Sequence, residues 1–269
     1  MKKKVLITVK TYPTLSKKYN ELVCTAGFLE DGSWIRIYPV AFRKKAYNDQ
    51  YRKYDWVEVD LVKNTSDFRK ESYRPVDSET SFVNVGHIDT KNNWAERKSI
   101  ILQNVYTDME GLIQEAQDES IGTSLAVFKP TKVLDFIYEE VEREWDASKL
   151  ASLKQFNLFE TVDSDNEFEV VKKLPFKFSY VFEDINGKKS KMMIEDWETG
   201  QLFWNCFGRT GDEKIACEQV KQKYLDDFAK KKDLHFYLGT TKKYHGWSHN
   251  PFVIIGTFTP KIELQTKLF

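Results

Sequence analysis

Two histidines lie four residues apart in the segment His245-Gly246-Trp247-Ser248-His249. On a helix this spacing would place both imidazoles on one face, where they could bind a metal ion. Gly246 and the pair Asn250-Pro251 favour a loop instead, and no cysteine pair with zinc-site spacing lies nearby. We therefore predict no metal site and no cofactor, and we expect His245 to contact a substrate or a phosphate from a loop.

Three carboxylates flank Trp197, namely Glu195, Asp196 and Glu198. Together with His245 and His249 they could serve an enzyme that acts on nucleic acid or a nucleotide, although charged residues are also common at a strand end. The glycines near residue 210 lack the Walker A spacing, and the chain has neither a nucleophile elbow nor a dinucleotide-binding fingerprint. No catalytic residue is predicted, and whether the protein is an enzyme stays open.

A different chemistry follows from the segment Trp34-Ile35-Arg36-Ile37-Tyr38. Side chains alternate between the two faces of a strand, so Ile35 and Ile37 share one face while Trp34, Arg36 and Tyr38 share the other. Bases stack on aromatic rings and on guanidinium planes, and each stack contributes about 1–3 kcal/mol. We expect the face with two rings and a guanidinium to contact single-stranded nucleic acid or a nucleotide.

Charge is distributed unevenly along the chain. Residues 1–54 contain twelve basic and four acidic side chains, whereas residues 108–169 contain sixteen acidic and five basic ones. Basic side chains neutralise phosphates and release counterions, so the first stretch favours nucleic-acid binding. The acidic stretch favours an alternative, a protein-interaction scaffold with a basic partner. The predicted nucleic-acid contacts are Lys10, Tyr12, Lys17, Lys18, Trp34, Arg36, Tyr38, Arg43, Tyr237 and His245.

Two structural alternatives stay open for the aromatic face. Trp34 and Tyr38 could lie under an amphipathic helix, with Arg36 reaching past them to solvent. The basic excess could likewise be an ordinary solvated surface. The helix itself is predicted from apolar residues at helical spacing, which are Ile101, Val105, Met109 or Leu112, and Ala116.

Alternating apolar residues predict the strands that would position these groups. The expected strands are residues 4–12, 21–29, 33–40, 54–62, 124–128, 132–141, 176–183, 191–197, 234–240 and 251–258. Asp31-Gly32 and Asn186-Gly187 predict tight hairpin turns, because each pair supplies the positive backbone angles that such turns need. The segment Thr210 to Glu213 has the pattern of a capping box and predicts a helix to about Lys231.

The chain is long enough for two domains of α+β class, both rich in strands. A polar stretch at residues 146–170 is the predicted linker between an N-terminal domain, residues 1–145, and a C-terminal domain, residues 171–269. The C-terminal part shows about four strands. Its predicted strands are therefore one short of a five-stranded barrel.

Bulk composition bounds the environment. The 41 acidic and 41 basic residues cancel, so any attraction to nucleic acid must be local. No apolar stretch approaches the length that crosses a bilayer, and we expect no membrane contact. The three cysteines are odd in number and far apart, which favours a reducing compartment and a cytoplasmic location.

Segments at both ends of the chain resemble bacterial dual OB-containing domain proteins. The matching residues are Lys10 to Pro13, Ser16 to Tyr19, Glu21 to Gly27, Trp34 to Arg43, Phe236 to Thr241, His245 and Pro251 to Gly256, with no match between residues 64 and 170. The resemblance implies two fused OB-type barrels that recognise nucleic acid or a nucleotide in bacterial defence against phage or other mobile elements. It implies no catalytic residues, and a protein partner encoded nearby is a further option.

Overall fold

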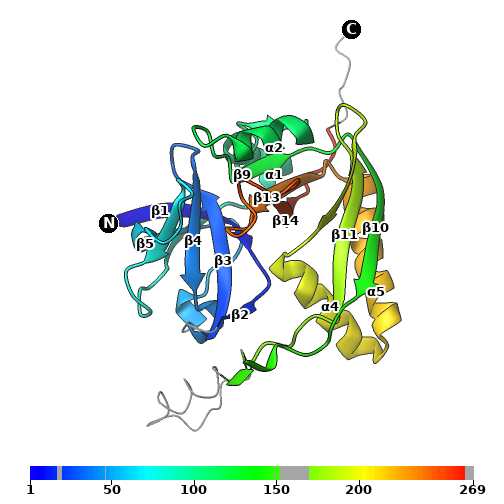
Figure 1. Ribbon diagram of the computed structural model, residues 1–269, viewed down its shortest axis with the longest axis horizontal. Helices are drawn as coiled ribbons and strands as arrows, with labels where there is room; N and C mark the ends of the chain where they lie inside the picture. Colours follow the sequence, from blue (N-terminus) through cyan, green and yellow to red (C-terminus); the bar gives the residue numbers. More distant parts are fainter. Residues whose placement is uncertain (17–19, 46, 149, 152–169, 264–269) are drawn as a thin grey trace. The chain divides into compact units, whose positions relative to one another are not determined.

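The computed structural model describes residues 1–16, 20–45, 47–148, 150–151 and 170–263. The chain forms two compact units, and each unit combines two separate stretches of sequence (Figure 1). The first unit contains residues 1–87 and 140–177, and the second contains residues 88–139 and 178–269. The predicted linker between residues 146 and 170 lies largely outside the described residues.

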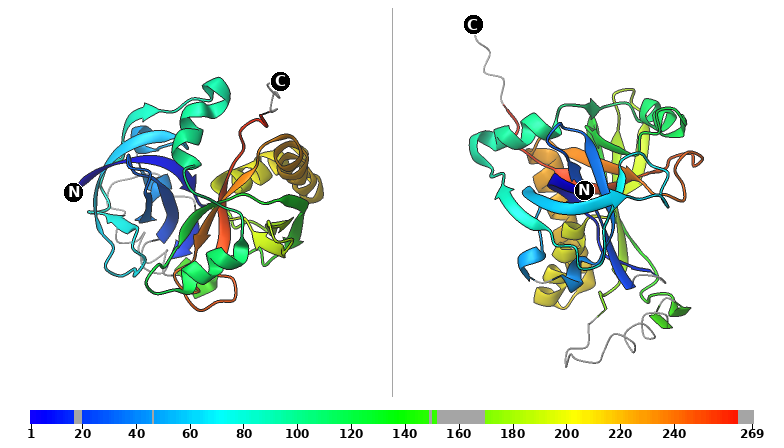
Figure 2. Two further views of the ribbon diagram at one scale, coloured as in Figure 1. Left: turned by 90° about the horizontal axis from the view of Figure 1, so that it is seen from above. Right: turned by 90° about the vertical axis from the view of Figure 1, so that its left-hand side faces the viewer.

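The first unit is built on a closed sheet. Its strands are β1 (Lys2–Lys10), β2 (Thr14–Ser16), β3 (Asn20–Phe28), β4 (Trp34–Val40), β5 (Asp55–Lys63), β6 (Ser72–Pro75) and β7 (Val83–His87), with short 3-10 turns η1 (Phe42–Lys44) and η2 (Tyr47–Asp49). Five of them follow the order β1-β3-β4-β6-β5, and β5 pairs again with β1. The strands curl into a five-stranded Greek-key barrel of OB type (Figure 2).

Alternation of side chains explains how these strands build the barrel. In β5 the residues Val57, Val59 and Leu61 are buried, while Glu58 and Asp60 face outward, as predicted. The predicted hairpin at Asp31-Gly32 is also confirmed, since Gly32 has φ 79° and the Leu29 amide donates to the Ser33 carbonyl. The strands expected at residues 4–12, 21–29, 33–40 and 54–62 are all present.

The second unit contains two sheets and most of the helices. Its elements are α1 (Lys91–Ile101), β8 (Val105–Tyr106), α2 (Met109–Gln117), β9 (Leu125–Phe128), β10 (Lys132–Glu140), β11 (Phe176–Glu183), β12 (Lys189–Met193), α4 (Trp197–Thr210), α5 (Glu213–Lys221), the π-helical turn η3 (Gln222–Ala229), β13 (His235–Thr240) and β14 (Phe252–Phe258). One sheet has the order β14-β13-β9-β8, and the other has the order β10-β11-β12.

The two sheets of the second unit repeat the strand order of the first barrel. Strand β9 runs into β10 through Pro130, and a parallel bridge joins Ile194, just after β12, to Ile254 in β14. If β9 and β10 are counted as one bent strand, the order of neighbours in the second unit is β9/β10-β11-β12-β14-β13. This order is the same as β1-β3-β4-β6-β5 in the first barrel. The strand that residues 171–269 lack is supplied by residues 125–140. The predicted α+β class with two barrel-like OB-type units is confirmed.

The helices differ from the sequence prediction in three places. The single helix predicted from Ile101 to Ala116 is wrong, because Val105–Tyr106 pairs with β9 and interrupts it. Helix α4 was not predicted. Helix α5 begins after Asp212, whose carboxylate accepts the Lys214 and Ile215 amides, so Thr210 is not the cap residue. None of the described helices is long and apolar enough to span a membrane.

Aromatic side chains fill the core of the second unit. Phe136 lies at its centre, with ring centroids 4.8 Å from Tyr180, 5.1 Å from Tyr224 and 5.9 Å from Phe178. All four residues are fully or almost fully buried. The Tyr180 hydroxyl donates to the Tyr224 carbonyl, which satisfies a polar group inside this apolar cluster. The core thus connects β10 and β11 to the end of the helical segment.

The close approach of β1 and β3 generates a stability prediction at Gly27. A Cβ atom at this position would lie 1.9 Å from the Leu6 carbonyl oxygen, so the backbone of β1 would have to move. We expect Gly27→Ala to destabilise the protein by about 3 kcal/mol in urea unfolding. Gly208→Ala is the matched control: it lies in α4 with open space around it and should be neutral or stabilising. Equal effects of the two changes would contradict this packing.

Candidate nucleic-acid interface

The predicted aromatic face on β4 is only partly open. Ile35 and Ile37 lie in the core as expected, and Trp34 and Tyr38 are half-buried on the other face. The Trp34 ring packs 4.0 Å from the Phe28 ring. Arg36 is 3% exposed, so the prediction that its guanidinium faces solvent is wrong.

Arg36 is buried because the end of the β5–β6 loop packs over it. The Arg36 amide donates to the Glu71 carbonyl, and its Nε lies 3.4 Å from the Glu71 carboxylate. Its Nη1 also approaches the Cys24 thiol at 3.7 Å. The parallel pairing of Arg36 with Ser72 causes this cover, and parity within β4 alone cannot reveal it.

Two further predicted contacts of the first unit, Lys10 and Tyr12, are also engaged within the protein. The Lys10 ammonium lies 4.0 Å from the centre of the Phe42 ring, and Lys10 is half-buried. Tyr12 is buried, and its hydroxyl donates to the Lys172 carbonyl. Lys17 and Lys18 lie outside the described residues.

Arg43 forms an ion pair with a buried carboxylate. Its Nη1 lies 2.7 Å from Glu21 Oε2, which also accepts the Val171 amide at 3.0 Å. Burial raises the pKa of the Glu21 carboxyl, although the charge of Arg43 acts in the opposite direction. These contacts hold the Val171–Lys172 segment against the first barrel, so Tyr12 and Arg43 act as supports for that segment.

An exposed aromatic pair occurs in the second unit, on the loop between β13 and β14. Trp247 is 67% exposed and Tyr244 is 41% exposed, and their ring centroids lie 5.5 Å apart. The Lys243 ammonium lies 5.2 Å from the Tyr244 ring, and Lys242 and His249 are also exposed. We call residues 241–251 the aromatic loop. Sequence analysis singled out its histidines and missed the rings, although Lys242-Lys243-Tyr244 between two strand patterns is a visible signal.

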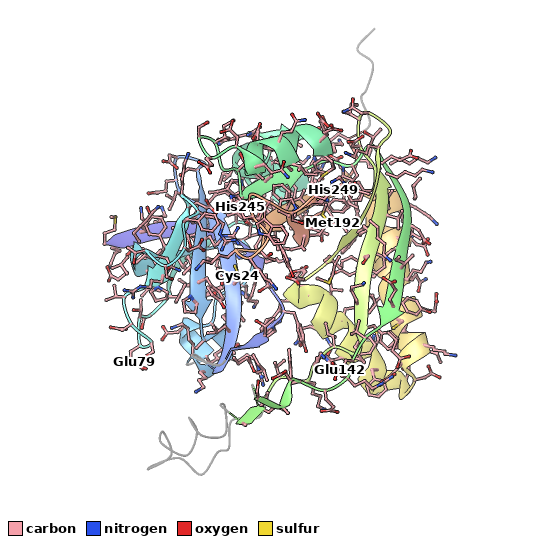
Figure 3. The ribbon with its side chains drawn as sticks, in the orientation of Figure 1. Cys24, Glu79, Glu142, Met192, His245 and His249 are labelled. Carbon is pink, nitrogen blue, oxygen red and sulfur yellow. The ribbon has the colours of Figure 1, made fainter. Side chains whose placement is uncertain are left out.

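Internal hydrogen bonds hold the aromatic loop in place. The Tyr244 and His245 amides both donate to the Thr241 carbonyl, and the Trp247 indole donates to the Lys243 carbonyl at 2.7 Å. His245 is buried, with Nδ1 3.0 Å from the Thr240 hydroxyl, whereas His249 is exposed (Figure 3). The ring of His245 therefore lies inside the protein, where it anchors the loop to β13.

Tyr237 is fully buried in β13, and its ring lies 6.4 Å from Phe258. The side chain thus belongs to the core of the second unit and not to its surface. The residue lies one strand position after Phe236, yet both are buried, because β13 pairs with β9 on one side and β14 on the other. A central strand can bury both faces, which a period-2 pattern does not reveal.

The first barrel carries a comparable loop at the same point of its circuit. Residues 64–71 connect β5 to β6, as residues 241–251 connect β13 to β14. Phe68 is exposed at the tip, next to exposed Lys70, and the Lys63 ammonium hydrogen-bonds to the Lys70 carbonyl. In each unit this loop joins the fourth barrel strand to the fifth, and we call it the strand-four to strand-five loop. Both loops present an aromatic ring beside lysines, and in OB-type barrels this loop is a recurrent oligonucleotide contact.

A buried ion pair sets the shape of the β5–β6 loop. Asp67 accepts Arg69 Nε at 2.9 Å and Nη2 at 2.5 Å, and Ser72 donates to the same carboxylate at 2.9 Å. Burial alone would raise the pKa of Asp67, but the hydrogen bonds and charge of Arg69 outweigh it and hold that pKa at about 2. The pair keeps Phe68 between its two members exposed.

The carboxylates considered for catalysis differ in their environment. Asp196 is buried at the start of α4, Glu198 is exposed, and burial raises the pKa of Glu195. No group of three metal-binding side chains occurs among the described residues.

Comparison with known proteins identifies a family. The chain belongs to the family described as Domain of unknown function (DUF8757), which matches residues 105–269, and residues 1–103 match Domain of unknown function (DUF8758). No curated protein matches the sequence. Among solved structures, a murine DNA-binding protein bound with double-stranded DNA aligns over 98% of this chain and 97% of its own, at 11% identity and a TM-score of 0.32. Such a score does not establish a common fold or ligand.

The buried pair in the β5–β6 loop generates a pH prediction. Asp67→Asn leaves the Arg69 charge buried without its carboxylate, and we expect a loss of about 3 kcal/mol at pH 7. The folded-state pKa of Asp67 is depressed, so its stabilisation is present above pH 4 and disappears as the pH falls toward 2. Denaturant unfolding at several pH values should therefore show the gap between wild type and variant narrowing across this range.

The control for this measurement is Asp60→Asn. Asp60 is exposed and makes no ion pair among the described residues, so its replacement should change stability by less than about 0.5 kcal/mol. A gap between wild type and Asp67→Asn that stays constant from pH 7 to pH 2 would exclude the buried ion pair as its cause.

Proposed function

We propose that the protein binds single-stranded nucleic acid through the strand-four to strand-five loops of its OB-type barrels. The observation that carries this proposal is the aromatic loop, where Tyr244 and Trp247 stand exposed beside Lys242 and Lys243. Exposed rings offer stacking surfaces for bases of any sequence, and the neighbouring ammonium groups attract phosphates. Phe68 and Lys70 supply the same two elements on the first barrel.

The residues predicted from the sequence enter the proposal in two roles. Lys10, Trp34 and Tyr38 are half-exposed and remain candidates for direct contact, as do Lys17 and Lys18. The others are held by contacts within the protein, and of these Arg43 is half-buried while the rest are buried. These residues are Tyr12, Arg36, Arg43, Tyr237 and His245.

The setting of this activity follows from the sequence resemblance. We place the protein in the cytoplasm, in a bacterial system that acts against phage or other mobile elements, with a single strand or a nucleotide as its ligand. Stacking on exposed rings and attraction between ammonium groups and phosphates do not depend on base identity, so we expect little sequence preference.

Binding of a fluorescent twenty-nucleotide thymidine strand, and of the matching uridine strand, tests the proposal. We expect affinity to fall steeply with added salt, because phosphate contacts release counterions. Trp247→Ala and Tyr244→Ala should each weaken binding about ten-fold, as expected for one lost stack. Fluorescence anisotropy at several salt concentrations measures both effects.

Tyr47→Ala is the matched control, since Tyr47 is 89% exposed on the first barrel and lies outside both loops. It should leave affinity within about two-fold of wild type. Binding that is absent, insensitive to salt, or equally reduced by Tyr47→Ala would refute the assignment of the site to the aromatic loop.

A further inference from the structure

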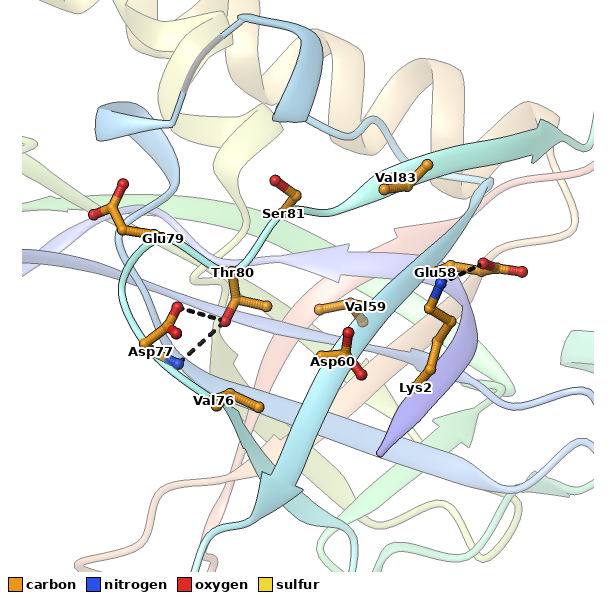
Figure 4. Close-up of a pocket in the computed structure, with 10 residues that line it drawn as sticks. All are labelled: Lys2, Glu58, Val59, Asp60, Val76, Asp77, Glu79, Thr80, Ser81 and Val83. Carbon is orange, nitrogen blue, oxygen red and sulfur yellow. Dashed lines mark hydrogen bonds and ion pairs between the residues drawn. The ribbon is translucent and has the colours of Figure 1, made fainter.

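A groove on the first unit has the opposite character to the aromatic loop. It lies between β5 and the segment that connects β6 to β7, and its volume is about 430 Å³ (Figure 4). We call it the acidic groove. Its lining residues are Lys2, Glu58, Val59, Asp60, Val76, Asp77, Glu79, Thr80, Ser81 and Val83.

Apolar surface remains open in the acidic groove. Val76 is 46% exposed and Val83 is 52% exposed, and the two lie on either side of the connecting segment. Val83 begins β7, an edge strand that pairs with β5 and, within the described residues, with no other strand. Exposed valines beside a sheet edge are the surface on which an extended peptide is commonly accommodated.

The rim of the groove is strongly negative. Four carboxylates line it, against one ammonium, that of Lys2. The Lys2–Glu58 pair is exposed at 3.4 Å and contributes little. Asp60 and Glu79 make no ion pair among the described residues.

The connecting segment is held in place before any ligand arrives. The Lys45 ammonium donates to the Thr80 carbonyl at 2.7 Å and lies 5.0 Å from the Phe82 ring. The Thr80 hydroxyl donates to Asp77 Oδ1 at 2.9 Å and accepts the Asp77 amide. Because this segment is already ordered, little conformational entropy is lost when a ligand binds, which favours a preformed docking site.

We propose that the acidic groove docks a basic peptide segment of a partner protein, with lysine or arginine side chains alternating with apolar ones. Basic side chains would meet the carboxylates, and the apolar ones would cover Val76 and Val83. The carboxylates do not form a metal-binding cluster among the described residues, so they suit separate cationic groups along a chain. Nucleic acid is repelled by this charge, and so is a second copy of the same groove.

A fluorescent Lys-Val-Arg-Val-Lys-Val-Arg peptide tests this docking by anisotropy with the full chain. Wild type should bind it in a salt-dependent manner, and the charge-reversed Glu-Val-Asp-Val-Glu-Val-Asp peptide should not bind. The double variant Asp60→Lys/Glu79→Lys should lower the affinity at least ten-fold. A second variant, Val76→Ser/Val83→Ser, keeps the net charge and should weaken binding several-fold through lost apolar contact.

The matched control is Glu96→Lys/Glu119→Lys, which makes the same change in net charge at two exposed carboxylates of the second unit. It should leave peptide affinity within about two-fold. The proposal is overturned if wild type does not bind the basic peptide or if both charge reversals weaken binding equally. Thymidine-strand binding should be unaffected or strengthened by the groove variants, so this result is independent of the proposed nucleic-acid site.

Discussion

In each OB-type circuit the third barrel strand (β4 or β12) lies parallel to the fifth (β6 or β14). This contact completes the circuit, and the candidate nucleic-acid surfaces depend on it. In the first barrel Arg36 and Ile37 pair with Ser72 and Tyr73, and in the second unit Ile194 bridges to Ile254. Parallel neighbours cannot be joined by a tight hairpin, so the fifth strand reaches the third through the fourth strand and the loop that follows it. The loop that connects strands four and five is consequently displayed in both units, once with Phe68 and once with Tyr244 and Trp247.

The same contact explains why the predicted surface and the observed one differ. Pairing of β4 with β6 brings Glu71 onto Arg36 and converts a predicted ligand group into a buried ion pair. Buried charges persist when they are paired, and Asp67 with Arg69 repeats this solution a few residues away. The aromatic side chains that remain exposed, Phe68, Tyr244 and Trp247, are on loops. Local hydrogen bonds already satisfy the backbone of these loops, and the rings do not pack into a core.

Local patterns were sufficient for much of the fold. Period-2 alternation located the longer strands of the first barrel, and the Asp31-Gly32 pair located a hairpin turn, because both signals depend on neighbouring residues. The short strands β2, β6, β7 and β8 were not predicted. The helix predicted across Val105 failed because pairing with β9 overrides helical spacing. Of the candidate site, the lysine-rich and aromatic composition could be seen in advance, but exposure could not: Arg36 and Tyr237 have strand neighbours that are distant in sequence.

The sequence by itself determined the α+β class of the protein, the position of most of its longer strands and the Asp31-Gly32 turn, since these depend on residue order and short-range periodicity. Only the tertiary structure decided which stretch completes which barrel, because residues 125–140 pair with strands that begin much later in the chain, at Phe176 and at His235. It also decided which charges meet. Pairing across long sequence separations buried Arg36 and Tyr237, and it left Trp247 and the carboxylates of the acidic groove facing solvent.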